Sequence, residues 1–146
     1  MGKKKSIYVG EELENYTKHH EKRNSFSGAI NTMADRHQYI IAQEMPKLLL
    51  EEWSLIFDSL NGYFGSPANH AIRGIVWNVS DSINIEKLDE KWEIDGEKLK
   101  EKLANMAAAN LLAILDASER WWGAVDGTHT DMDDSIRYIV GENNVL

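Results

Sequence analysis

Polar and hydrophobic side chains alternate along residues 4–9 of the chain. Ile7 and Val9 share one face of this stretch, and the opposite face is more polar. Alternation with a period of two is typical of a short β-strand with one buried face, and Gly10 ends the pattern. Because no second strand is predicted downstream, the backbone groups of this strand lack a partner in their own chain. We therefore expect the strand to pair with the same strand of a second copy.

Apolar positions recur with helical spacing after this strand. A helix is predicted over residues 11–23, where acidic residues in the first turn and basic residues in the last suit the helix dipole. A second helix is predicted to begin near Ser25 or Ser27, either of which can cap it, and to end near residue 44. The strand and these two helices form a predicted module of residues 1–45.

Residues 46–146 are predicted to form a second domain that contains helices only. Pro46 marks its start, and Asp95 is predicted to cap its longest helix. The predicted helices cover about residues 47–61, 67–79, 84–92, 95–122 and 135–140. The fold class is therefore mostly α, with a strand-helix-helix module followed by an all-helical domain.

Charge is distributed unevenly between the two parts. The chain has 146 residues and a net charge of −8, but residues 1–43 hold seven Lys and Arg against five Asp and Glu. The remainder holds nine Lys and Arg against nineteen acidic residues. Attraction for phosphate is thus concentrated at the N-terminus, and the second domain is acidic.

The absence of some residue types and patterns narrows the class of protein further. The chain has no cysteine, which excludes disulfides and thiolate metal sites and fits a reducing cytoplasm. Its apolar runs are far shorter than the roughly 20 residues needed to cross a bilayer. We expect a cytoplasmic protein with no membrane partner.

The N-terminal part resembles the ribbon-helix-helix (Arc/MetJ-type) family of DNA-binding proteins. The resemblance is carried by Lys4–Val9 followed by Glu11–Leu13, and by the turn and helix start at Asn24–Asn31. It implies that two strands from two chains form a β-ribbon that enters the major groove of double-stranded DNA. This sequence departs from the family in having one obvious base-reading cation, a Gly28 that weakens the second helix, and a longer second helix.

The family pattern assigns roles to residues of this sequence by position. Outward strand residues would contact bases, namely Lys4, Ser6 and Tyr8. The tail and the start of the second helix would contact phosphates, through Lys3, Ser25 and Ser27. Apolar residues would form the dimer core, namely Ile7, Val9, Leu13, Ile30 and Met33. Lysine donates well to guanine O6 and N7, and a helix N-terminus presents free N–H groups to an anion.

Simpler interpretations stay open for several of these residues. The run of lysines at residues 3–5 also fits a solvated tail, and Tyr8 fits a half-exposed strand aromatic. The histidines lie at no clear metal-ligand spacing, and the acidic stretch at residues 126–134 lacks the EF-hand pattern. No metal or cofactor is therefore expected. Because Trp121 and Trp122 cannot share one helix face, one of them is predicted to contact another chain or the N-terminal module.

The leading hypothesis is a homodimeric DNA-binding protein, a transcriptional repressor that reads a short palindrome through the β-ribbon. The acidic domain would extend the dimer, pair dimers on adjacent half-sites, or bind a protein partner. The alternative is a dimeric inhibitor or interaction protein, such as an antitoxin or a phage-type inhibitor, which acts through the acidic domain. No catalytic motif is present, so no enzyme is expected. An enzyme would require a deep polar pocket within residues 47–122.

Overall fold

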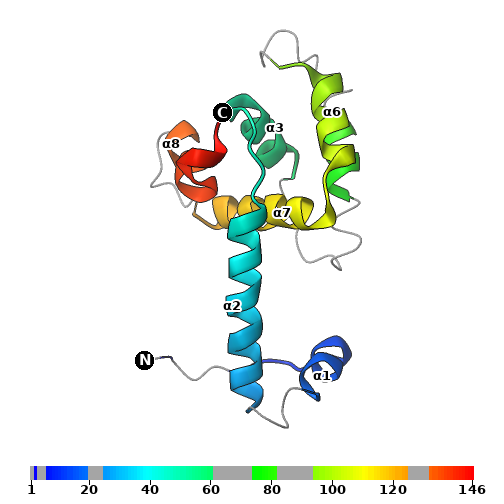
Figure 1. Cartoon of the computed structure of the whole chain (residues 1–146), viewed down its shortest axis with the longest axis vertical. Helices are drawn as coiled ribbons and strands as arrows, with labels where there is room; N and C mark the ends of the chain where they lie inside the picture. Colours follow the sequence, from blue (N-terminus) through cyan, green and yellow to red (C-terminus); the bar gives the residue numbers. More distant parts are fainter. Residues whose placement is uncertain (1, 3–5, 20–24, 61–73, 82–93, 125–131) are drawn as a thin grey trace. The chain divides into compact units, whose positions relative to one another are not determined.

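The chain is mostly helical in a computed structural model that describes all residues except 1, 3–5, 20–24, 61–73, 82–93 and 125–131 (Figure 1). The helices are α1 (Glu11–Thr17), α2 (Phe26–Glu44), α3 (Leu50–Ser59), α6 (Gly96–Asn105), α7 (Ala108–Ala124), α8 (Met132–Val140) and the 3-10 turn η1 (Glu142–Asn144). Residues 74–81 are also helical. The mostly α prediction is confirmed. Residues 6–10 have no regular secondary structure in the single chain, so the N-terminal strand stays a prediction.

Two compact units make up the chain, Met1–Tyr39 and Ile40–Leu146. The division falls inside α2, whereas the sequence placed a boundary between residues 45 and 46. Helix α2 ends at Glu44, close to its predicted end. Helix α1 ends at Thr17, well short of the predicted residue 23, and is followed by two turn residues.

The predicted long helix over residues 95–122 is wrong, because the structure has two helices there, α6 and α7. Met106 is extended between them, with ψ at 144°. The Asn110 side chain accepts a hydrogen bond from the Ala107 N–H at 3.2 Å, which satisfies a free donor at the start of α7. Its Nδ2 donates to the Glu44 carbonyl at 2.8 Å. Asn110 thus stabilises the new helix start and joins it to the end of α2.

The core of the second unit lies among α3, α7 and α8, which pack against one another. Trp53 and Phe57 of α3 are fully buried, with ring centroids 5.5 Å apart. Phe57 lies at the same distance from Trp121 of α7. Ile136 brings α8 into this cluster. Aromatic rings in such tilted arrangements add to the stabilisation that burial alone provides.

The C-terminal segment is tied to the residues that precede α3. Leu48 and Val145 form an isolated parallel β-bridge. The Asn144 carbonyl accepts hydrogen bonds from the Leu48 N–H at 3.2 Å and from the Trp53 indole at 3.0 Å. Gly141, with φ at +89°, makes the turn after α8 that a side chain would strain. The Asn144 carbonyl thus holds both the C-terminal tail and the Trp53 indole in place.

None of the helices among the described residues has the length and apolar character needed to cross a membrane.

Candidate nucleic-acid interface

The predicted base-contacting side chains face solvent where the structure describes them. Ser6 is exposed and Tyr8 is almost fully exposed. Lys3 and Lys4 lie outside the described residues. The Ser6 and Tyr8 side chains are therefore accessible to a ligand, and all three base contacts stay predictions.

The apolar side chains between them are exposed as well. Ile7 is 54% exposed and Val9 is 40% exposed. Burying side chains of this size stabilises a structure by about 1.5–3 kcal/mol each. A single chain leaves about half of that free energy unused, so this face has room for a partner.

The first turn of helix α1 is acidic. Gly10 is its N-cap and makes no side-chain cap hydrogen bond, while Glu11, Glu12 and Glu14 occupy the first turn. These carboxylates suit the helix dipole but repel phosphate. Thr17 is buried and donates to the Leu13 carbonyl at 2.9 Å. The start of helix α1 is therefore a poor site for an anion.

Helix α2 begins in a different way, at a serine cap. The Ser25 Oγ accepts a hydrogen bond from the Gly28 N–H at 3.1 Å, and the Ser25 carbonyl accepts from the Ala29 N–H at 2.8 Å. Of the two predicted caps, Ser25 is the one that forms, and Ser27 is exposed in the first turn. The first turn of α2 holds no acidic residue. An anion meets less repulsion here than at α1.

Replacing Ser25 by alanine should destabilise the start of α2 by about 1 kcal/mol, because the Gly28 N–H loses its acceptor. Amide hydrogen exchange over the first two turns of α2 would measure the change, with a roughly fivefold loss of protection expected. Ser27→Ala is the matched control and should leave protection unchanged. Equal effects of the two substitutions would contradict the assigned cap.

Little of the first unit is buried in the single chain. Among the described residues of Met1–Tyr39, Thr17 and Ala29 alone are buried. The other residues of the predicted dimer core within the helices, Leu13, Ile30 and Met33, are only partly covered. This unit also has an open groove of about 410 Å³, lined by Val9, Glu14, Thr17, Lys18 and Phe26. The sequence patterns did not single out Lys18 or Phe26 as lining residues.

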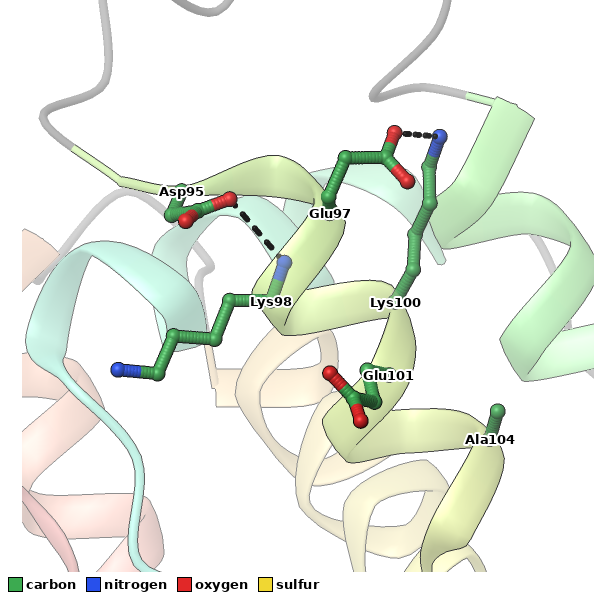
Figure 2. A pocket seen from close by; sticks show the side chains of 6 residues that line it. All are labelled: Asp95, Glu97, Lys98, Lys100, Glu101 and Ala104. Atoms are coloured by element: carbon green, nitrogen blue, oxygen red, sulfur yellow. Dashed lines mark hydrogen bonds and ion pairs between the residues drawn. The ribbon is translucent and has the colours of Figure 1, made fainter.

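A second hollow lies on the second unit and is shown in Figure 2. It is lined by Asp95, Glu97, Lys98, Lys100, Glu101 and Ala104, all from α6 or its cap. The Asp95 Oδ1 accepts from the Lys98 N–H at 3.1 Å, as the predicted cap requires, and Lys100 pairs with Glu97 at 2.9 Å. Glu97 and Lys100 thus pair with each other, and Asp95 caps the start of the same helix. The hollow is therefore a charged helix face and not the deep pocket that an enzyme would require.

Among the described residues, no three His, Asp or Glu side chains gather as metal ligands would. Most of the acidic stretch considered above falls outside them; Asp133 and Asp134 begin α8 and are exposed.

Comparisons of the chain with protein-family models, with curated proteins and with solved structures found no match. The residues and contacts of this chain are therefore the basis for assigning its function. Its central feature is a small unit with an uncovered apolar stretch beside exposed Ser6 and Tyr8.

Proposed function

We propose that the chain is a homodimeric DNA-binding protein, a transcriptional repressor that reads a short palindrome through a β-ribbon made of two N-terminal strands. Residues 1–45 form the dimerising and DNA-binding module. Residues 46–146 extend the dimer, pair neighbouring dimers or bind a protein partner. No cofactor or catalytic step belongs to this function.

The first unit buries few of its side chains in the single chain, and this observation is the main support for the proposal. Units of fewer than about 40 residues seldom bury enough surface to fold alone, and many obtain their core by oligomerisation. Ile7 and Val9 remain exposed on one side, and Leu13, Ile30 and Met33 are half-covered. A second copy would cover these side chains together.

Pairing two strands would also satisfy the backbone groups of residues 4–9, and it would turn Lys4, Ser6 and Tyr8 outward on one face. A two-stranded ribbon fits the major groove, where lysine and hydroxyl donors distinguish base pairs. The serine-capped start of α2 then offers backbone N–H groups to a phosphate. Symmetry of the dimer predicts a palindromic site.

Tyr8→Ala in the full chain should weaken binding to the selected DNA site by about 1–3 kcal/mol per half-site, because each half-site loses a base contact. Genomic fragments retained by the wild-type protein would be sequenced, and affinity for the enriched palindrome measured at two salt concentrations. Lys4→Ala should lower both the affinity and the salt dependence. Tyr138→Ala is the matched control, because Tyr138 is an exposed tyrosine of α8.

No enriched palindrome from a folded dimer would overturn the DNA-binding proposal. Equal losses for Tyr8→Ala and Tyr138→Ala would overturn the role of the ribbon.

The alternative is a dimeric protein-interaction or inhibitor protein, an antitoxin or phage-type inhibitor among them, that acts through residues 46–146. The excess of nineteen acidic over nine basic residues after residue 43 favours a basic partner. In that case Lys4→Ala and Tyr8→Ala would leave activity intact, whereas charge reversals in the second unit would remove it.

A further inference from the structure

The last turn of α2 belongs to the second unit, which begins at Ile40. Ile41 is buried, as is Met45 just beyond the helix, and both are part of the core cluster of this unit. The Asn110 Nδ2 of α7 donates to the Glu44 carbonyl at 2.8 Å and to the Glu44 Oε2 at 3.3 Å. The last carbonyls of a helix have no partner within it, so Asn110 supplies one here. Packing and hydrogen bonds therefore hold this turn in place.

The first unit itself gives the rest of α2 little support from packing. Residues 26–39 of α2 lie in the first unit, and Ala29 is the one buried residue among them. Several residues of this stretch are also weak helix formers, namely Asn31, Thr32, Asp35, His37 and Tyr39. Packing of an apolar face supplies most helix stability in proteins. Residues 26–39 therefore need a further source of helix stability in the single chain.

A helix extends readily from a turn that is already formed. The first turn forms with an equilibrium constant about 10³ times lower than that of each later step. The turn at residues 41–44 supplies such a nucleus, and α2 is one continuous helix from Phe26 to Glu44. Contacts that lie wholly within the second unit thus favour helix formation at residues 26–39. Coupling of this kind passes along the helix backbone and requires no particular arrangement of the two units.

We propose that the second unit nucleates α2, so that the contacts of its last turn determine how completely residues 26–39 are helical. Asn110 is the positioning residue of this coupling, because it holds the Glu44 end of the helix. Under the proposed function the Ser25-capped start of α2 offers backbone N–H groups to a phosphate, and this consequence alone rests on DNA binding. A partner that changes the contacts of Glu44 would then alter phosphate binding at a site that it does not touch.

Asn110→Asp in the full chain separates the two roles of the Asn110 side chain. The new carboxylate still accepts from the Ala107 N–H, so α7 keeps its cap. It cannot donate to Glu44, and it places a second negative charge beside the Glu44 Oε2. Residue-resolved amide hydrogen exchange should show about a fivefold loss of protection at residues 30–39 as well as at residues 41–44.

Two further variants test whether the effect passes through the end of α2. Glu44→Gln/Asn110→Asp restores a donor and an acceptor in exchanged positions, so protection at residues 30–39 should return to within about twofold of the wild type. Ala42→Gly weakens the anchored turn without changing a buried side chain, because Ala42 is exposed, and it should also lower protection at residues 30–39 by about fivefold.

Asp95→Ala is the matched control, because it removes one cap hydrogen bond of the second unit, at the start of α6, and none of α2. It should leave protection along α2 unchanged, and urea unfolding would verify that the second unit of each variant is folded. Losses confined to residues 41–44 in both Asn110→Asp and Ala42→Gly would overturn the proposal. An equal loss for Asp95→Ala, or no recovery in the double variant, would also overturn it. These measurements use no DNA, so their failure is distinct from failure of the DNA-binding proposal.

Discussion

Trp53→Ala should lower the free energy of unfolding of the second unit by about 3–5 kcal/mol, the cost of removing a large aromatic side chain from a packed core. Trp53 is fully buried, contacts Phe57, and donates its indole N–H to the Asn144 carbonyl. Its removal leaves a cavity among α3, α7 and α8 and also removes one of the hydrogen bonds that hold the tail. Urea unfolding followed by far-UV circular dichroism would measure the loss.

Trp77→Ala is the matched control for this experiment. Trp77 lies in the helical residues 74–81 but is 67% exposed, so its loss should change the free energy of unfolding by less than about 0.5 kcal/mol. The loss in free energy of unfolding for Trp53→Phe should lie between these two values, because phenylalanine keeps most of the apolar volume but lacks the indole N–H donor. Similar losses for Trp53→Ala and Trp77→Ala would contradict the assignment of Trp53 to the core.

Local sequence signals were sufficient for several helix starts and for one helix end. The sequence predicts Asp95 as one cap and either Ser25 or Ser27 as the other; Asp95 and Ser25 each accept the expected backbone hydrogen bond from the residue three positions later. Helix α2 ends two residues before Pro46, which cannot continue a helix. Such signals involve residues that are neighbours in the chain, so the sequence carries them directly.

Contacts between distant residues account for what the sequence did not predict. The apolar periodicity runs without interruption through residues 95–122, yet the helix breaks at Met106, where Asn110 bonds to Glu44, 66 residues away. The periodicity of one segment contains no information about that partner. Apolar periodicity alone therefore does not predict the break between α6 and α7.

For the adjacent tryptophans, the predicted contact of one of them with another chain or with the N-terminal module stays a prediction, and the structure shows what both contact within the second unit. Both indoles pack within the second unit, with centroids 4.8 Å apart in a T-shaped arrangement. Trp121 donates to the Ser135 hydroxyl at 2.8 Å, and Trp122 donates to the Phe57 carbonyl at 3.0 Å. Helices on two sides of α7 provide these acceptors. The two adjacent indoles therefore contact each other as well as this unit, and Trp122 remains partly exposed.

For the candidate interface, the sequence predicts which side chains share a face of the strand, but not how two strands pair. Alternation along residues 4–9 predicted an apolar face and a polar face, and the described part, residues 6–9, is exposed on both. A strand that pairs with its own copy has no partner within the single chain, so its geometry depends on a second molecule. The groove beside Thr17 and Phe26 depends on how α1 and α2 meet, which periodicity does not specify.

A buried ion pair between α3 and α6 also escaped prediction, because its residues are 50 positions apart. The Glu52 side chain is 3% exposed, and its two oxygens accept from the Lys102 Nζ at 2.8 and 3.0 Å. Glu52 Oε1 also accepts from the Leu49 N–H at 3.0 Å, at the start of α3. One carboxylate thus caps α3 and holds α6 beside it.

Lys102→Met should lower the free energy of unfolding of the second unit by about 2–4 kcal/mol, because it leaves the Glu52 charge buried without its ammonium partner. The expected loss is below that of a fully buried pair, since Lys102 is 32% exposed and water reaches the vacated position. Lys100→Met is the matched control on the same helix. Its partner Glu97 is 84% exposed, so the loss should stay below about 1 kcal/mol.

The double variant Glu52→Gln/Lys102→Met separates the charge from the helix cap. The glutamine amide oxygen still accepts from the Leu49 N–H, while both charges are gone, so most of the stability lost in Lys102→Met should return. Urea unfolding at low and at high salt would measure all three variants. If the double variant is less stable than Lys102→Met, the buried charge is not the source of the loss. The Glu52 carboxylate would then stabilise the start of α3 even without Lys102, through its hydrogen bond with the Leu49 N–H.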